Sequence, residues 1–219
     1  GIIGYIGDKC ASDILISGLS HLEYRGYESS GVALMHNSKN GFDIDIYKAP
    51  GKLINLIEIL KTKTDITDIS KIGIGHIRWA THGLPTTLNA HPHTCNCGSL
   101  TLVHNGIIEN YQELKEELTK KGAIYKSQTD TEIAAHLIAY EYEKTNDLLS
   151  AMQNAVKKIR GAFAFCAIHK SEPDKIVVAK RNAPLVLGVG EGENYIASDI
   201  PAIIEYTKKA IYIQLLNLH

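Results

Sequence analysis

The chain has 219 residues, of which 44% are hydrophobic and 21% charged, and its formal net charge is −1. Such a length and composition are typical of a globular protein, and we expect one domain over residues 1–219. A near-neutral chain without a block of like charge offers no basic surface for nucleic acid. It also has no apolar stretch of about 20 residues that could span a membrane. We therefore expect a small-molecule partner and a cytoplasmic location.

The first half of the chain predicts strands separated by helices. A glycine turn ends an apolar strand over residues 2–7, and a helix follows from Ser12 with its leucines and isoleucines on one face. Apolar and polar residues alternate over 42–47, which predicts a strand with one solvated face. A second helix is expected over 52–61, and a strand over 71–79 leads into a long polar loop.

The second half predicts helices followed by strands. A strand over 100–104 precedes an amphipathic helix that ends at Gly122, and the spacing of Thr129 and Glu132 predicts a capping box for the next helix. Another helix is expected over 147–159. Four strands then follow, over 162–169, 176–180, 185–189 and 195–197. Several are apolar on both faces, so both sides of their sheet should be covered, and the pattern indicates a layered α+β domain with more than one sheet.

Polar residues at strand ends are the candidates for chemistry. Arg78 ends a predicted strand, and its planar fork of donors suits a carboxylate, although a single arginine is more often part of a surface ion pair. Thr81 and His82 follow in the same loop and could add donors to the same anion. Each could equally be a loop residue bonded to its own backbone.

Two further positions have a catalytic and a structural interpretation. Asn105-Gly106 could combine a side-chain amide and a backbone N–H into an oxyanion hole, but Asn-Gly is also a strong signal for a tight hairpin turn. Spacing alone favours the turn. Asp130 could bind an ammonium group, or it could only complement the positive end of its helix.

A metal site and a nucleotide site are poorly supported. His91, His93, Cys95 and Cys97 lie close together in the sequence, but Cys-x-Cys is not a zinc knuckle and no second ligand pair follows at the required spacing. Whether these four residues bind a metal stays open. The segment GVGEGE at 188–193 lacks the last glycine of a dinucleotide fingerprint. We expect neither a metal nor a cofactor, and Cys166, inside an apolar run, should be a buried free thiol.

Five segments in a fixed order carry the polar candidates: LEYRGYES (22–29), GHIRWATHG (75–83), NAHPH (89–93), VHNGIIEN (103–110) and SQTDTE (127–132). Together they resemble the glutaminase domain of class II glutamine amidotransferases, which are N-terminal-nucleophile hydrolases. The form that these motifs take in this sequence resembles in particular the glutamine-fructose-6-phosphate aminotransferase branch of that family. APLVLGVG (183–190) and YIASD (195–199) extend the resemblance over nearly the whole chain. It implies an α+β fold built as a four-layer α/β/β/α sandwich.

The resemblance also implies a reaction. Such a domain hydrolyses glutamine to glutamate and ammonia with an N-terminal cysteine, whose own α-amino group accepts the proton. The family begins Cys-Gly-Ile and this chain begins Gly-Ile-Ile, so we expect the nucleophilic cysteine immediately before Gly1. None of Cys10, Cys95, Cys97 and Cys166 carries a free α-amine.

The same resemblance assigns roles to individual residues. Arg78, Thr81 and His82 would hold the substrate α-carboxylate, and Asp130 with Gly106 its α-amino group. Asn105 and Gly106 would form the oxyanion hole. Trp79 would lie in the loop that closes over glutamine, and Arg25 would support the nucleophile.

The expected partners follow from the branch. Glutamine is the substrate, and fructose-6-phosphate, the acceptor for glucosamine-6-phosphate synthesis, would be reached only through a sugar-phosphate isomerase portion that lies outside this chain. The full-length enzyme is expected to be a homo-oligomer. Two alternatives stay open: an inactive glutamine-binding module, or the glutaminase domain of another class II enzyme such as amidophosphoribosyltransferase.

Overall fold

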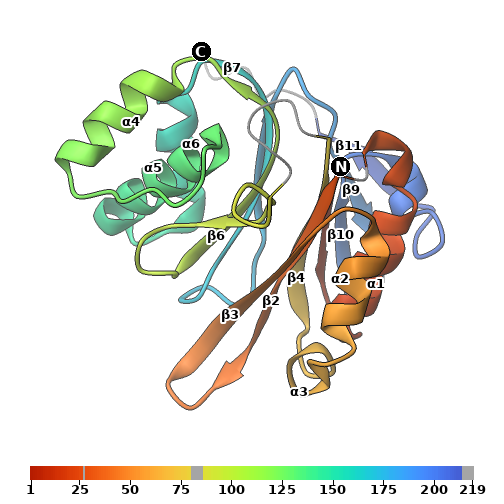
Figure 1. Ribbon diagram of the computed structural model, residues 1–219. Coiled ribbons are helices and arrows are strands. Elements are labelled where there is room, and N and C mark those ends of the chain that lie inside the picture. The colour runs from red at the N-terminus through yellow and green to blue at the C-terminus, as the bar shows by residue number, and fades with distance from the viewer. Residues whose placement is uncertain (27, 80–85, 214–219) are drawn as a thin grey trace.

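Two antiparallel sheets lie face to face, and each has helices on its outer side (Figure 1). The computed structural model describes residues 1–26, 28–79 and 86–213. This four-layer arrangement confirms the α+β sandwich expected from the sequence.

The larger sheet contains seven strands, in the order β11-β9-β10-β1-β4-β2-β3. They are β1 (Ile2–Ile6), β2 (Ser29–Ser38), β3 (Gly41–Pro50), β4 (Ile72–Arg78), β9 (Val186–Val189), β10 (Asn194–Ala197) and β11 (Ala210–Tyr212). The first strand lies in the interior of the sheet, between β10 and β4, with Ile2 opposite His76. The N-terminal end of the described chain is therefore held against the end of β4.

The smaller sheet contains four strands, in the order β5-β6-β7-β8. They are β5 (His93–Thr94), β6 (Leu100–Ile108), β7 (Gly161–His169) and β8 (Val177–Arg181). β6 pairs with β7 along its full length, with Asn105 opposite Ala164.

Helices cover the outer face of each sheet. α1 (Ala11–Ser20), α2 (Leu53–Leu60) and the short α3 (Thr64–Thr67) lie on the larger sheet. The 3-10 turn η1 (Glu23–Arg25) contacts β4, and the 3-10 turn η2 (Ile200–Ala202) contacts α1. α4 (Tyr111–Lys120), α5 (Asp130–Thr145) and α6 (Leu148–Lys158) lie on the smaller sheet.

The core has three apolar layers, one at each contact between the four layers. Leu15 and Leu56 pack α1 and α2 on the larger sheet, and Leu137 packs α5 on the smaller one. Ile74 and Cys166 meet between the sheets. Strands that are apolar on both faces are therefore covered on both faces, as predicted. Cys166 is a buried free thiol, also as predicted.

Two local predictions were wrong. Asn105 and Gly106 lie inside β6 rather than in a hairpin turn, because β6 continues to Ile108 and pairs with β7 beyond them. Thr129 is the N-cap of α5, but its side chain makes no capping bond, and Glu132 accepts the backbone N–H groups of Lys126 and Ser127 instead. The acidic side chain therefore orders the preceding loop and does not form a capping box.

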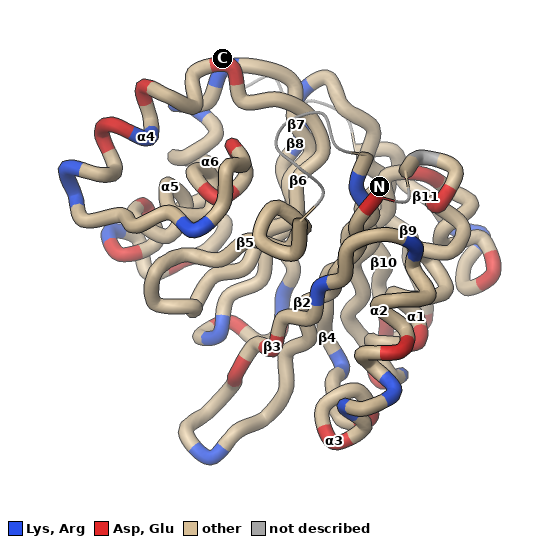
Figure 2. Tube along the Cα trace, viewed as in Figure 1, with Lys and Arg blue, Asp and Glu red and all other residues tan. Residues whose placement is uncertain are grey.

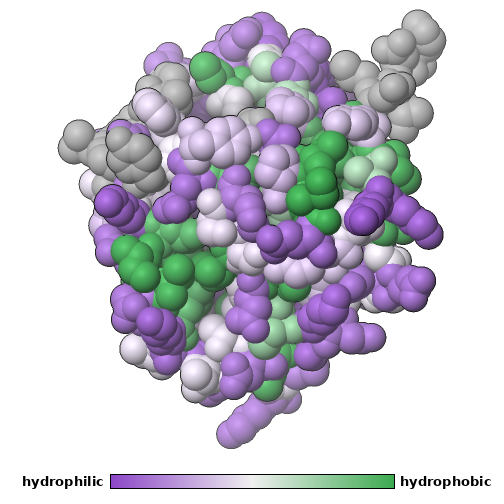
Figure 3. All heavy atoms as spheres, turned by 90° about the vertical axis from the view of Figure 1, so that its right-hand side faces the viewer, coloured by the Kyte–Doolittle hydropathy of each residue, from purple (hydrophilic) through white to green (hydrophobic). Residues whose placement is uncertain are grey.

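The surface has no dominant sign of charge. Lys and Arg alternate with Asp and Glu along α4 and around α2 and α3 (Figure 2). On the face turned toward the viewer in Figure 3, apolar areas are separated by polar residues. Among the described residues, no helix is long and apolar enough to cross a membrane.

Candidate active site

A cleft of about 440 Å³ lies where the ends of β4 and β6 meet the start of α5. Its lining includes Arg78, Trp79, Asn105, Gly106 and Asp130, five of the residues predicted from the sequence. Its volume is within the range of roughly 300–1,000 Å³ that is usual for small-molecule sites. Residues separated by up to 52 positions in the sequence are thus brought together by the pairing of strands and the packing of α5.

Arg78 supplies the positive charge of the cleft. It is the last residue of β4 and is only 6% exposed. Burial lowers the pKa of its guanidinium, while the carboxylates of Glu28 and Asp130 oppose this shift. An arginine keeps its charge under such conditions, so the cleft contains a fixed cation with planar donors.

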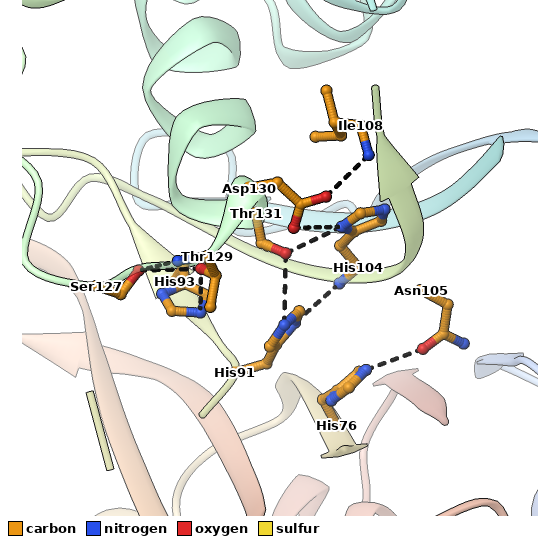
Figure 4. Close-up of polar contacts among 10 residues, drawn as sticks. All are labelled: His76, His91, His93, His104, Asn105, Ile108, Ser127, Thr129, Asp130 and Thr131. Carbon is orange, nitrogen blue, oxygen red and sulfur yellow. Dashed lines mark hydrogen bonds and ion pairs between the residues drawn. The ribbon is translucent and has the colours of Figure 1, made fainter. Parts of the chain in front are cut away.

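Asp130 supplies the negative charge. It is the first residue of α5, and its Oδ2 accepts the backbone N–H of Ile108 at 2.8 Å, which ties the helix to β6 (Figure 4). Its Oδ1 lies 3.9 Å from His104 Nδ1. Asp130 and Arg78 together give the cleft one anion and one cation, which is the charge pattern complementary to an α-amino acid.

Asn105 and Gly106 form the β6 side of the cleft. Asn105 Oδ1 is 2.9 Å from His76 Nε2 across the gap between the sheets. Gly106 has φ +119°, and a Cβ at this position would lie 2.0 Å from the carbonyl oxygen of Ala162. Only glycine therefore fits here, and the exposed Gly106 leaves room for a ligand next to the Asn105 amide.

Four histidine rings lie beneath the cleft. His76 stacks on His91 with centroids 4.1 Å apart, and His93 meets His91 edge to face at 4.9 Å. Thr131 Oγ1 lies 2.9 Å from His104 Nδ1 and 3.4 Å from His91 Nε2 (Figure 4).

Burial keeps these histidines neutral. It lowers the pKa of His76, His91 and His93 well below the ordinary value and that of His104 to about 4. His76 and His104 were not among the residues predicted from the sequence. The available signal was strand alternation, which places His76 on the same face of β4 as Ile72 and Ile74 and therefore between the sheets.

The N-terminal end of the described chain also lies at this cleft. Gly1 lines it, and its nitrogen donates a hydrogen bond to the carbonyl oxygen of Ile77 at 2.6 Å. The N–H of Ile77 donates in turn to the carbonyl of Gly1 at 2.9 Å. These two bonds fix the start of β1 beside Asn105 and Arg78.

The remaining candidates are placed only in part. Trp79 follows Arg78 at the mouth of the cleft and is 60% exposed. Arg25 ends η1, next to Gly26, whose backbone approaches Trp79 so closely that an added Cβ would lie 2.7 Å from its nitrogen. Thr81 and His82 lie outside the described residues, and so does the side chain of Arg25.

The four residues considered as metal ligands lie in two places. His91 and His93 belong to the histidine group under the cleft, whereas Cys95 and Cys97 lie in the turn between β5 and β6 with their sulfur atoms 3.2 Å apart. In the described part of the chain, no three or more His, Cys, Asp and Glu residues form a cluster that could hold a metal ion.

A second cavity, of about 410 Å³, lies beside β3 and β5 and includes Lys48, His93 and Glu132. Burial lowers the pKa of Lys48 to about 8. This cavity contains none of Arg78, Asn105 and Asp130, so the chemistry predicted from the sequence selects the first cleft.

Comparison with known proteins identifies the family of this chain. The family model of the glutamine amidotransferase domain matches residues 78–205, which includes Arg78, Asn105 and Asp130. The chain belongs to the glutamine amidotransferase domain family. As a member of this family it is the amidotransferase domain of an enzyme.

The relatives of this amidotransferase domain are longer proteins. The chain is 53% identical over 211 residues to glutamine-fructose-6-phosphate aminotransferase (isomerising) of Aquifex aeolicus and 48% identical over 214 residues to that of Thermococcus kodakarensis. These matches cover 96% and 97% of this chain, which spans only 34% of either relative.

A solved structure confirms the fold. Glutamine phosphoribosylpyrophosphate amidotransferase of B. subtilis, solved with ADP and GMP, superposes with a TM-score of 0.77 at 26% identity. The match covers 97% of this chain and 44% of that chain. The fold expected from the resemblance to N-terminal-nucleophile hydrolases is therefore present.

Proposed function

We propose that the cleft binds glutamine and releases ammonia from its side-chain amide, leaving glutamate. The observation that carries the proposal is the placement of a buried cation, an anion and the Asn105–Gly106 pair around one cleft. A cleft of this kind suits acyl transfer, in which charge develops on a carbonyl oxygen next to hydrogen-bond donors.

The charges orient the substrate. The α-carboxylate binds the planar donors of Arg78, with Thr81 and His82 adding donors from their loop, and the α-amino group binds Asp130 and the Gly106 carbonyl. This places the side-chain amide of glutamine toward Asn105 and Gly1. The Asn105 amide nitrogen and the Gly106 N–H then donate to the carbonyl oxygen as it becomes negative. Trp79 covers the substrate, and Arg25 supports the reacting end of the chain.

The nucleophile is a cysteine joined to the nitrogen of Gly1. This assignment is supported by the position of Gly1 in the cleft and by the motif order, since none of Cys10, Cys95, Cys97 and Cys166 lines the cleft. A cysteine at this position could use its own α-amino group as the base, because the ordinary pKa of that group is about 7.7–8.0.

The reaction then has two stages. The cysteine sulfur bonds to the amide carbon while its proton passes through the α-amino group to the leaving nitrogen, and the C–N bond breaks to release ammonia. Water next attacks the thioester, which yields glutamate and the free thiol. Donors in the oxyanion hole stabilise the charged oxygen in both stages.

In the full-length protein the ammonia is used to aminate fructose-6-phosphate. This acceptor is supported by the identity of 53% and 48% with two glutamine-fructose-6-phosphate aminotransferases. The acceptor site belongs to the part of those relatives that this chain does not span, and the full-length protein is proposed to be a homo-oligomer.

The test is to supply the full-length protein with glutamine alone and with fructose-6-phosphate. We expect glutamate in both cases, accompanied by free ammonia without the sugar and by an amino-sugar phosphate with it. No glutamate in either case would contradict the glutaminase function. Glutamate that is coupled to phosphoribosylpyrophosphate instead of the hexose phosphate would overturn only the acceptor.

A further inference from the structure

A hydrogen bond between the two sheets reaches the centre of the cleft. His76 lies in β4 of the larger sheet, Asn105 lies in β6 of the smaller one, and His76 Nε2 is 2.9 Å from Asn105 Oδ1 (Figure 4). His76 is 4% exposed and Asn105 is half-buried. The contact therefore links the interior to a residue that faces the ligand space.

The chemistry of the two partners determines which atom carries the proton. A side-chain carbonyl oxygen can only accept, so His76 Nε2 must be the donor. His76 is neutral because burial lowers its pKa, and its single ring proton is therefore on Nε2.

The other ring nitrogen agrees with this tautomer. His76 Nδ1 is buried and has no hydrogen-bond partner among the described residues. A buried N–H without a partner is rarer in folded proteins than a buried acceptor without one. A proton on Nε2 avoids the orphaned donor.

This tautomer fixes the direction of the Asn105 amide. With Oδ1 engaged by His76, the amide nitrogen lies on the side away from the imidazole (Figure 4). We propose that His76 is a positioning residue for the glutaminase reaction, which holds the Asn105 amide with its donors toward the cleft. The inference rests on the proposed function, because it requires Asn105 to donate to the developing oxyanion.

The orientation of His76 is itself maintained by its neighbours. Its ring stacks on His91 with an angle of 18° between the planes. His91 Nδ1 accepts the backbone N–H of His104 at 3.3 Å, so His91 carries its proton on Nε2, facing Thr131 Oγ1. The backbone N–H of His104 thus fixes the orientation of the His91 ring, and the His76 ring is held parallel to it by stacking.

The reversed amide would be harmful. If the Asn105 nitrogen donated to His76, Oδ1 would face the cleft and repel the negative oxygen of the tetrahedral intermediate. His76 prevents this reversal without touching the substrate in the proposed pose. The predicted effect is therefore on the chemical step, while glutamine binding by Arg78 and Asp130 stays intact.

The test compares variants of His76 in the full-length protein. His76→Gln can place its amide nitrogen near the position of imidazole Nε2 and should keep most of the activity. His76→Asn is a matched control, because its shorter amide reaches only the position of Nδ1 and cannot donate to Asn105. His76→Leu removes the donor entirely.

We expect His76→Asn and His76→Leu to lower kcat by about tenfold to a hundredfold, the usual effect of a slightly misplaced catalytic group, with KM for glutamine changed less than about threefold. Thermal melting checks folding. Should His76→Leu not fold, the Gln and Asn pair decides. Equal kcat for these two variants would overturn the proposal, since a merely structural polar residue tolerates either amide.

A double-mutant cycle separates this inference from the proposed function. If His76 acts through Asn105, the double variant His76→Asn with Asn105→Ala should be no slower than Asn105→Ala alone. Additive losses would contradict the positioning role. An unchanged kcat in Asn105→Ala would contradict the oxyanion assignment itself. A loss in Asn105→Ala without one in His76→Asn would overturn only the inference about His76.

Discussion

At the scale of single residues, Arg78 is the clearest case of a side chain whose setting favours ligand binding. It is buried at the end of a central strand and lines a cleft, where its planar donors suit a carboxylate. Its role in binding a carboxylate was predicted from the five segments together, because a single arginine at a strand end is more often part of a surface ion pair. Its burial could be known only from the position of β4 in the interior of the sheet.

Arg78→Ala should weaken glutamine binding. Removing one partner of a desolvated charge pair costs about 2–5 kcal/mol, so we expect a large rise in KM and a matching fall in kcat/KM. Arg78→Lys should recover little, because a point charge does not reproduce the planar fork. Initial rates of glutamate release over a range of glutamine concentrations measure both. An unchanged KM in Arg78→Ala would remove this residue from the substrate site.

Asn105→Asp distinguishes a catalytic from a structural role for Asn105. Aspartate has nearly the same shape, but a carboxylate that faces the cleft repels the negative oxygen of the intermediate. We expect kcat to fall by at least roughly a hundredfold to a thousandfold, which is the loss that follows removal of one oxyanion donor. A wild-type kcat in a folded Asn105→Asp protein would show that the role of Asn105 is structural and not catalytic.

Single residues also show what sequence reasoning could not reach. His76 and His104 have the same local pattern as histidines of an ordinary core. Their significance depends on partners 29 and 27 positions away, Asn105 and Thr131, which only strand order and helix packing bring near. The roles of Thr81 and His82 remain predictions from the motif alone.

At the scale of elements, β6 shows how a strong local signal was overridden. Asn-Gly ordinarily predicts a tight turn, yet here the dipeptide continues a strand, because β7 pairs with the residues before and after it. The positive φ of Gly106 is accommodated inside the strand, where the backbone passes close to Ala162. The local sequence indicated that the backbone at position 106 requires glycine, but it could not distinguish a strand from a turn.

Gly106→Ala should destabilise the protein more than Gly98→Ala. Both glycines have positive φ, but a Cβ at Gly106 would lie 2.0 Å from Ala162 O, whereas at Gly98 nothing lies within 4 Å. Gly98→Ala should cost about 1–2 kcal/mol for its left-handed backbone, and Gly106→Ala more than that because the strands must also separate. Denaturant unfolding of both variants measures the difference. Equal losses would contradict the close approach.

At the scale of the whole molecule, strands that are apolar on both faces predicted a layered α+β domain with more than one sheet, and the family resemblance implied its four layers. The strand order could not be predicted, because β1 inserts between β4 and β10, whose residues are about 70 and 190 positions along the chain. That order brings Gly1 into the cleft. The polar group of four histidines between β4, β5, β6 and α5 is likewise a property of the assembled fold.

These buried histidines predict a loss of stability in mild acid. In the unfolded chain an imidazole titrates near pH 6.5 (roughly), whereas burial lowers the folded pKa of His104 to about 4 and that of His76 and His91 well below the ordinary value. Between these values only the unfolded chain binds the protons. The free energy of unfolding should therefore be at its highest above about pH 6.5 and should fall as the pH drops toward about 4.

Urea unfolding between about pH 7 and about pH 5 checks this dependence. His104→Gln is the informative variant, because glutamine can bond to Thr131 without titrating. Its slope should be shallower than that of the wild type by up to about 1.4 kcal/mol per pH unit, the contribution of one proton. A stability that is flat across this range in the wild type would contradict the burial of neutral histidines.

The central claim is that the residue joined to Gly1 attacks glutamine inside this cleft. A glutamine analogue with a chloromethyl ketone in place of the side-chain amide should alkylate the nucleophile with loss of chloride, and peptide mass analysis of the full-length protein locates the label. We predict one label per chain, on a cysteine immediately before Gly1, with protection by excess glutamine and loss of labelling in Arg78→Ala. A label on Cys10, Cys95, Cys97 or Cys166, or labelling that glutamine does not prevent, would contradict the claim.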